Sequence, residues 1–150
     1  MRTTIKILIL IGLTISMAFS CTKEEKLPAN QAEGTILQTF RACYGYWIMI
    51  EVENPKGIGV SGTFAFPGDE DSRITYQNAI GIPYFDKIPE LHTEAPDTIG
   101  TWLRFEYRDL TTEERNSNIF VDTSFQGICN TMIAPPDAHM YMITKIIGYR

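Results

Sequence analysis

Residues 100–110 read Gly-Thr-Trp-Leu-Arg-Phe-Glu-Tyr-Arg-Asp-Leu, and polar and apolar side chains alternate along them. Extended backbone places successive side chains on opposite faces of a strand. One face of this segment then carries Thr101, Leu103, Phe105 and Tyr107, and the other carries Trp102, Arg104, Glu106 and Arg108. A period of two with apolar residues on one side predicts a half-buried β-strand.

Weaker patterns of the same kind lie on both sides of this segment, separated by turn signals. Asn54-Pro55-Lys56-Gly57 has turn chemistry, because proline fixes φ and glycine is free to adopt φ > 0. Residues 84–98 contain Pro89 and Pro96, so we expect a long loop there. The other strand candidates are residues 34–41, 46–52, 58–66, 73–82, 119–125 and 140–149.

The fold class follows from these strands, since no long segment repeats apolar residues at the helical period. Five to seven strands and their turns within about 130 residues predict a small barrel or sandwich. Closure of a barrel removes strand edges that otherwise promote aggregation. We therefore expect an all-β domain in the form of a small, partly open β-barrel of the OB type. An immunoglobulin-like sandwich is the alternative.

The N-terminal residues have the order of parts of an export signal. Arg2 and Lys6 supply positive charge, and residues 7–19 form an almost unbroken apolar run of thirteen. A transmembrane helix needs about 20 apolar residues, so the run is short for one. We predict a signal peptide at residues 1–20, a flexible tether at residues 21–33 and one β-rich domain at residues 34–150.

Cys21 comes directly after this run and follows Ala18-Phe19-Ser20. The order resembles the lipobox of bacterial lipoproteins, in which a diacylglycerol is attached to the cysteine thiol before the signal is cleaved. The resemblance implies lipidation at Cys21 and attachment to a membrane through the lipid. One acyl chain binds a membrane only marginally, whereas two or three hold a protein stably. An ordinary secretory signal and a retained transmembrane helix are the alternatives.

Lys23, Glu24 and Glu25 follow the cysteine closely. A lysine and two acidic residues in this place resemble the surface-export tag of Bacteroidota lipoproteins. The resemblance implies a lipid-anchored protein of the cell outer membrane that is exposed at the cell surface. A charged, solvated linker on a protein that stays on the periplasmic face is the alternative.

The charge balance limits the classes of partner. Without residues 1–20 the chain has eleven basic and eighteen acidic residues, a net charge of −7. Nucleic-acid binding needs clustered Lys and Arg that replace counterions, and anionic lipid surfaces attract basic segments. We therefore expect no nucleic-acid partner and no membrane contact beyond the lipid.

Two cysteines remain if Cys21 is acylated. Cys43 and Cys129 are 86 residues apart, and an exported chain can pair them because its compartment permits oxidation. In the chain-entropy account such a disulfide contributes about 4–5 kcal/mol to stability. Two inert buried thiols are the alternative.

Motifs that carry reaction chemistry are weak in this sequence. Residues 57–62 fit the string GxGxxG, but β-forming residues follow where a nucleotide site needs a helix. Asp69-Glu70-Asp71 lacks the spacing of a calcium loop and favours a solvated turn. His92 and His139 lack the spacing of metal ligands, and we expect both at the surface. The sequence thus predicts no catalytic residue, no metal site and no cofactor.

Two residues are candidates for modification or ligand contact. Asp97-Thr98-Ile99 resembles the O-glycosylation acceptor of Bacteroidota envelope proteins, which implies a glycan on Thr98. Trp102 shares the expected solvent face with Arg104 and Arg108. An aromatic ring among charges can stack on a sugar or on a partner. Coverage of this face by loops is the alternative for Trp102.

The whole mature chain resembles the small β-rich lipoproteins of unknown function found in Bacteroidota. The features that carry this resemblance are Cys21, Lys23-Glu24-Glu25, Tyr44-Gly45 before an aromatic strand, residues 76–81 and residues 102–107. The resemblance brings no assigned activity. We expect a lipid-anchored, non-catalytic envelope lipoprotein that binds a glycan or a protein partner. An envelope hydrolase and an inhibitor or immunity-type lipoprotein are the alternatives.

Overall fold

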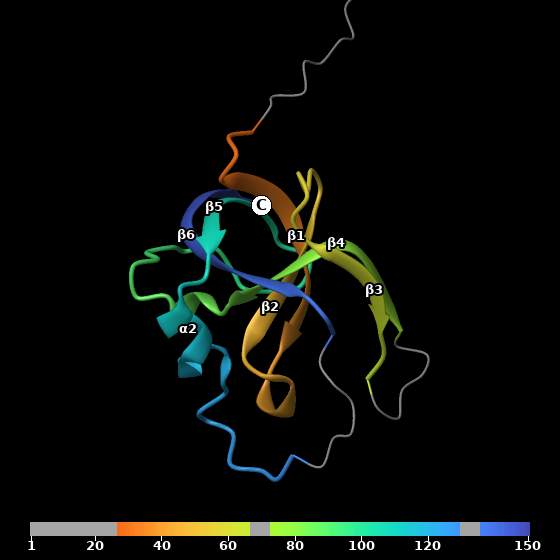
Figure 1. Cartoon of the computed structure of the whole chain (residues 1–150), viewed down its shortest axis with the longest axis vertical. Helices are drawn as coiled ribbons and strands as arrows, with labels where there is room; N and C mark the ends of the chain where they lie inside the picture. Colours follow the sequence, from red (N-terminus) through yellow and green to blue (C-terminus); the bar gives the residue numbers. More distant parts are fainter. Residues whose placement is uncertain (1–26, 67–72, 130–135) are drawn as a thin grey trace, which may run out of the picture.

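The protein is described by a computed structural model, which places residues 27–66, 73–129 and 136–150 (Figure 1). Its regular elements are mostly strands, and its helical segments are short. The strands are β1 (Gln31–Phe40), β2 (Trp47–Val52), β3 (Val60–Phe64), β4 (Ile74–Pro83), β5 (Trp102–Asp109) and β6 (His139–Tyr149). The helical segments are η1 (Ala42–Tyr44), η3 (Phe85–Lys87), α2 (Thr112–Asn116) and η4 (Asn118–Phe120).

All six strands belong to one sheet with the order β2-β1-β5-β6-β4-β3, and β2 also pairs with β4. This extra pairing closes β1, β2, β4, β6 and β5 into a ring, whereas β3 pairs only with β4. The seam between β4 and β6 is parallel and consists of the pairs Ile80↔His139 and Gly81↔Met140. The predicted small all-β fold, expected as a partly open barrel of the OB type, is confirmed as one sheet whose strands pair in a ring. The immunoglobulin-like alternative is wrong, because a sandwich needs two sheets.

The alternation within residues 100–110 corresponds to a half-buried strand, β5, as predicted. Thr101, Leu103 and Phe105 are buried, whereas Trp102 and Arg104 are partly exposed. Strand β5 lies between β1 and β6, so its apolar face points into the ring.

Strand β1 begins three residues earlier than Gly34, where the sequence pattern placed it. Ala32 is 1% exposed and lies opposite Phe105 in the ladder with β5. The expected tether at residues 21–33 is therefore too long at its C-terminal end. The sequence pattern did not reveal this earlier start, because Ala32 is small and its neighbours Gln31 and Glu33 are polar.

The main core fills the ring. Isoleucines of β1, β2, β4 and β6 meet Leu103 and Phe105 of β5 there. Fully buried members are Ile36, Ile48, Ile50, Ile80, Ile82, Leu103, Phe105 and Ile143. At about 25 cal/mol per Å² of buried apolar surface, this core is the main source of stability.

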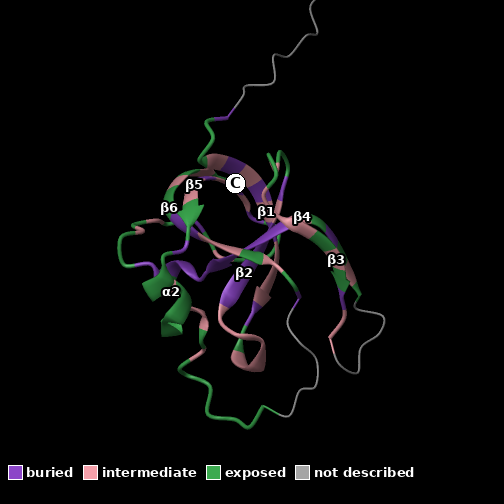
Figure 2. Cartoon of the chain, viewed as in Figure 1, coloured by how far each residue is buried: buried purple, intermediate pink, exposed green. Residues whose placement is uncertain are grey.

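A second hydrophobic cluster covers the outer side of β2 and β4, where Figure 2 shows buried residues. Trp47 and Met49 alternate with the core residues Ile48 and Ile50, so they point away from the ring interior. The ring of Phe40 stacks on that of Trp47 with centroids 4.3 Å apart. Phe64 of β3, a strand outside the ring, belongs to the cluster, and Met140 of β6 packs against it. OB-type folds bind ligands on this face, but here it is buried.

Residues 119–125 do not form the predicted strand. Asn118–Phe120 is a single turn of 3-10 helix, and Ser117 caps it by accepting a hydrogen bond from the amide of Ile119. Helix α2 precedes it, and Thr111 and Glu114 form a reciprocal capping box at the start of this helix. Local side-chain hydrogen bonds thus determine the backbone here, although the apolar residues have a strand-like spacing.

Candidate functional site

Three connections meet at one end of the ring of strands. Residues 41–46 join β1 to β2, residues 84–88 follow β4, and residues 117–129 lie between α2 and β6. We call these residues the loop rim. In Figure 1 its first and third segments lie at the end of the molecule opposite the described segment that leads into β1.

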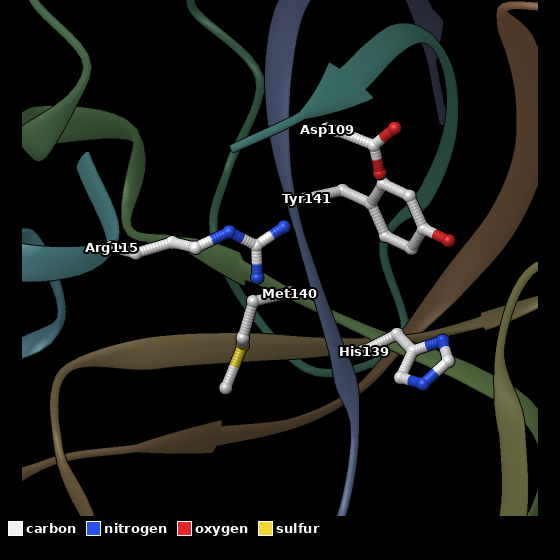
Figure 3. A pocket seen from close by; sticks show the side chains of 5 residues that line it. All are labelled: Asp109, Arg115, His139, Met140 and Tyr141. Atoms are coloured by element: carbon white, nitrogen blue, oxygen red, sulfur yellow. The ribbon is translucent and has the colours of Figure 1, made fainter. Parts of the chain in front are cut away.

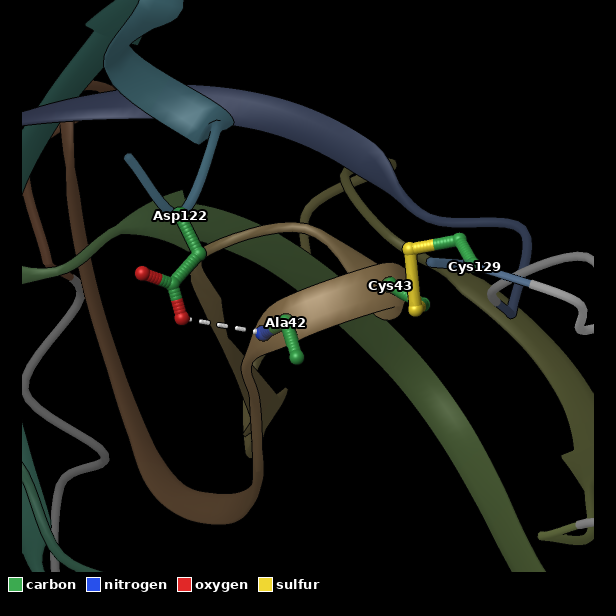
Figure 4. The surroundings of a disulfide bond; sticks show 4 residues. All are labelled: Ala42, Cys43, Asp122 and Cys129. Atoms are coloured by element: carbon green, nitrogen blue, oxygen red, sulfur yellow. Dashed lines mark hydrogen bonds between the residues drawn. A yellow bond between two sulfur atoms is a disulfide. The ribbon is translucent and has the colours of Figure 1, made fainter. Parts of the chain in front are cut away.

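A disulfide joins the first and third segments of the loop rim. Cys43 and Cys129 are bonded, with their Cα atoms 5.4 Å apart (Figure 4). The amide of Ala42 donates to Asp122 Oδ2 at 3.0 Å, and the amide of Tyr46 donates to the Phe120 carbonyl at 2.7 Å. Three links therefore hold together loops that are distant in sequence.

Asp122 is held in its charged form by its neighbours. Its pKa is lowered, chiefly because the Ser124 hydroxyl donates to it and secondly because the Ala42 amide does so. A carboxylate that accepts several hydrogen bonds favours ionisation. The hydrogen bond from the Ala42 amide to Asp122 therefore has a charged acceptor at neutral pH.

Aromatic and basic side chains gather beside the disulfide. The rings of Tyr46 and Tyr84 stack with centroids 4.1 Å apart, and Tyr84 is only 1% exposed. Arg41 Nε donates to the Tyr84 hydroxyl at 3.0 Å, and the Tyr46 hydroxyl donates to Asp86 Oδ2 at 3.2 Å. Lys87 Nζ lies 5.2 Å from the centre of the Tyr46 ring. We call Arg41, Tyr46, Tyr84, Asp86 and Lys87 the tyrosine–cation cluster.

The electrostatics of this cluster keep its donors protonated. Burial raises the pKa of Tyr46, and the nearby charge of Asp86 raises it further. The hydrogen bond to Tyr84 raises the pKa of Arg41. At neutral pH the cluster therefore presents a phenol and a guanidinium, and the side chain of Lys87 lies beside the Tyr46 ring.

The third segment of the loop rim exposes apolar side chains. Ile128 is 87% exposed, Val121 is 48% exposed and Phe125 is 38% exposed. Exposed apolar side chains favour contact with another molecule where they form a continuous patch. The disulfide and the hydrogen bonds of Asp122 restrain the backbone of this segment.

Trp102, the predicted ligand contact, lies away from the loop rim. Its indole Nε1 donates to Glu53 Oε1 at 3.0 Å, and the Arg150 guanidinium carbon lies 4.3 Å from its ring centre. Arg150 also exchanges two backbone hydrogen bonds with Trp102. The ring therefore already has polar partners within the fold, which leaves less of it available to a ligand.

Thr98 lies in an exposed turn before β5. Its hydroxyl is 3.1 Å from that of Thr101, and its carbonyl accepts from the Thr101 amide at 3.1 Å. Ile99 beside it is 61% exposed. The lipidation residue Cys21, the export-tag residues Lys23, Glu24 and Glu25, and the acidic segment 69–71 lie outside the described residues.

Both histidines are exposed, as predicted. His139 lines an open cavity of about 320 Å³ with Asp109, Arg115, Met140 and Tyr141. Figure 3 shows the side chains of His139 and Tyr141 on one side of β6 and that of Arg115 on the other. These groups therefore do not point toward a common centre.

His92 lines a separate shallow groove with Glu94, Ile147 and Tyr149. Within residues 27–66, 73–129 and 136–150, no three side chains suited to metal ligation lie together. The GxGxxG string of residues 57–62 runs into strand β3.

Sequence reasoning missed the tyrosine–cation cluster. Arg41 and Tyr84 are 43 residues apart, and the pairing of Trp47 with Pro83 between β2 and β4 brings their segments together. The only signal in the sequence is a high density of aromatic residues near positions 44–47 and 84–85. That density does not reveal which rings are partly exposed.

Comparisons with known proteins add no assignment. No protein-family model matches the chain, and no curated protein matches it. Among the helices that the structure describes, none has the length and apolar character needed to cross a bilayer.

Proposed function

We propose that this chain is a lipid-anchored, non-catalytic binding protein of the cell envelope that holds its ligand at the loop rim. Lipidation at Cys21 and display on the outer membrane are parts of this proposal. The observation that carries it is the position of the two disulfide-linked segments of the loop rim at the end of the molecule opposite the segment that leads into β1. A tether at the N-terminal side would direct this end away from the membrane.

The connections involved support the same function. Residues 41–46 join the first and second strands of the ring, and residues 110–138 join its fourth and fifth. OB-type folds bind oligosaccharides and oligonucleotides with these two connections. The net charge of the chain disfavours the oligonucleotide. Cross-linked loops lose little entropy on binding, which favours affinity without a deep pocket.

A protein partner is the second candidate, as for an inhibitor or immunity-type lipoprotein. Val121, Phe125 and Ile128 favour it, because exposed apolar groups on a restrained loop are typical of protein interfaces. Their location on the loop rim is compatible with either kind of ligand.

The anchor is tested by metabolic labelling with an alkyne analogue of palmitate. We expect the wild-type chain to incorporate the label and to stay with the membrane fraction, and Cys21→Ser to do neither. Protease added to intact cells should cleave the wild-type chain if it is displayed at the surface. A Cys21→Ser chain that remains membrane-bound would contradict the lipid anchor.

The binding surface is tested by photo-crosslinking in the native host. A benzophenone amino acid, which inserts into C–H bonds of proteins and sugars, replaces Phe125 in one variant and Ile147 in the other. Both side chains are exposed, at 38% and 41%, but only Phe125 belongs to the loop rim. We expect a discrete adduct from position 125 and none from position 147. Equal adducts, or none at position 125, would contradict the proposal.

A further inference from the structure

We infer that the tyrosine–cation cluster is a subsite for an acidic sugar, a pyranose ring that bears a carboxylate or a sulfate. This inference deepens the proposed function and rests on it. Its ligand would contact the part of Tyr46 that Tyr84 leaves exposed and place its anionic group between Arg41 and Lys87.

The platform is fixed before any ligand arrives. One contact holds the Tyr46 ring against the buried ring of Tyr84 at 4.1 Å, and another holds its hydroxyl on Asp86 at 3.2 Å. A ring that is restrained at its face and at its tip loses little freedom on binding. Aromatic faces carry partial negative charge, so they attract the C–H groups on the apolar face of a pyranose.

The two cations beside this platform have donor capacity left. Arg41 uses its Nε on Tyr84, and among the described residues no group accepts a hydrogen bond from its two terminal nitrogens. Lys87 Nζ contacts the Tyr46 ring and forms no ion pair with a carboxylate of the described part of the chain. The planar fork of arginine matches carboxylate and sulfate oxygens, and lysine adds a point charge.

The charge context makes this arrangement specific. The chain without residues 1–20 has a net charge of −7, so its overall charge disfavours an anion, and Asp97 is a nearby carboxylate that acts on Arg41. Arg41 Cζ is 5.4 Å and Lys87 Nζ is 5.2 Å from the same Tyr46 ring centre. Asp86, which accepts from Tyr46, is exposed and can also accept from a sugar hydroxyl. The cluster thus offers the three kinds of contact that an acidic sugar needs.

Isothermal titration of the full-length chain in detergent micelles tests the inference with three probes. These are trigalacturonate, which carries only carboxylates, a sulfated galactan oligosaccharide without carboxylates, and neutral galactotriose. We expect one or both charged probes to bind about tenfold or more tightly than the neutral one, because each lost charge-assisted contact costs about that factor. The charged probe that binds identifies the anionic group.

Variants separate the subsite from general electrostatics. Lys87→Gln and Arg41→Lys should each weaken binding of the charged probe about tenfold, the first by removing a charge and the second by removing the fork. Lys145→Gln removes an equal charge from an exposed position on β6 and should change affinity less than about twofold. The thermal unfolding of each variant shows whether it is folded.

Three results would overturn the inference. These are no binding of either charged probe, equal binding of galactotriose, and an equal loss of affinity in Lys145→Gln and Lys87→Gln. If neither charged probe binds but position 125 still gives a crosslink, the binding function is retained and only the acidic-sugar subsite is contradicted. If probe binding and the crosslink from position 125 are both absent, the subsite and the binding function are both contradicted.

Discussion

Gly34 occupies a place in β1 where no larger residue fits. It pairs with Val52 of β2 and with Leu103 of β5, so both neighbours of β1 in the ring approach it. A β-carbon there would overlap the carbonyl oxygen of Glu51 and would lie 2.8 Å from Ile50 Cγ2. The obstacle is backbone, which cannot move aside as the end of a side chain can.

We expect Gly34→Ala to lower the free energy of unfolding by about 1–3 kcal/mol, the usual range for overpacking. Gly148→Ala is the matched control, because a β-carbon at Gly148 would meet no atom within 4 Å. Its effect should stay within about 0.5 kcal/mol. Urea denaturation of both variants measures the difference, and equal effects would show that the close approach is not what excludes alanine.

Glu114 links stability to pH at the single-residue scale. Its pKa falls from 4.5 to about 2, first because Arg108 donates to it and secondly because the Thr111 amide does so. A carboxyl whose pKa is lowered by folding stabilises the fold above its unfolded pKa. That contribution is lost as the pH falls from about 4.5 toward 2.

We expect Glu114→Gln to lower the melting temperature by about 2–4 °C at pH 7, since a partly exposed pair contributes at most about 1 kcal/mol. The difference from wild type should shrink as the pH falls toward 2, where the wild-type carboxyl also becomes neutral. Glu113→Gln is the control on the same helix turn. A difference that does not depend on pH would contradict this account.

At the scale of elements, a strand could be predicted where its alternation reflects burial in the sheet, but not where local hydrogen bonds set the backbone. Strand β5 was predictable because its period reflects burial against two neighbouring strands. Residues 119–125 have a similar spacing, but Ser117 and Asp122 bind the backbone locally and hold it in turns. The two register shifts of β6 against β5 were not predictable, because a bulge depends on the partner strand.

The candidate site was less predictable than the fold. The sequence indicated Trp102 from its place among charged residues, whereas the structure gives that ring partners in Glu53 and Arg150. Arg41 and Tyr46 form a cluster with Tyr84 only because the pairing of β2 with β4 brings Tyr84 to them. A site made from the ends of strands depends on strand pairing, which one sequence does not show.

The disulfide that joins two segments of the loop rim should contribute strongly to the free energy of unfolding. It spans 86 residues, for which chain entropy gives about 4 kcal/mol or more. We expect Cys43→Ser with Cys129→Ser to lower the free energy of unfolding by roughly this amount in urea denaturation. Wild-type protein treated with a reductant should behave like the double variant, and unchanged stability in both would contradict the prediction.

At the scale of the whole molecule, the tether and the loop rim define an axis. Lys56 Nζ donates to the carbonyls of Leu27 and Pro28, so the turn at residues 54–57 lies beside the first residues that the structure describes. The first and third segments of the loop rim lie at the other end in Figure 1. An anchor at Cys21 would therefore place the turn nearer the bilayer than the loop rim.

We expect this axis to appear in energy transfer to lipid-bound acceptors. In vesicles that carry the full-length chain, a fluorophore incorporated at Asn54 should be quenched more than one at Ser124, because transfer falls steeply with distance. Both positions are exposed. Equal quenching would mean that the domain lies on its side, and the reverse order would contradict the proposed display.

The seam between β4 and β6 has a consequence for biosynthesis. It joins only two residue pairs, and β6 is translated after every other strand of the ring. Until the ribosome releases residues 139–149, β4 and β5 each have an unpaired edge and the isoleucines inside are open to water. A premature stop codon within this strand would therefore yield not a slightly shorter protein but an unfinished sheet, which quality-control proteases remove.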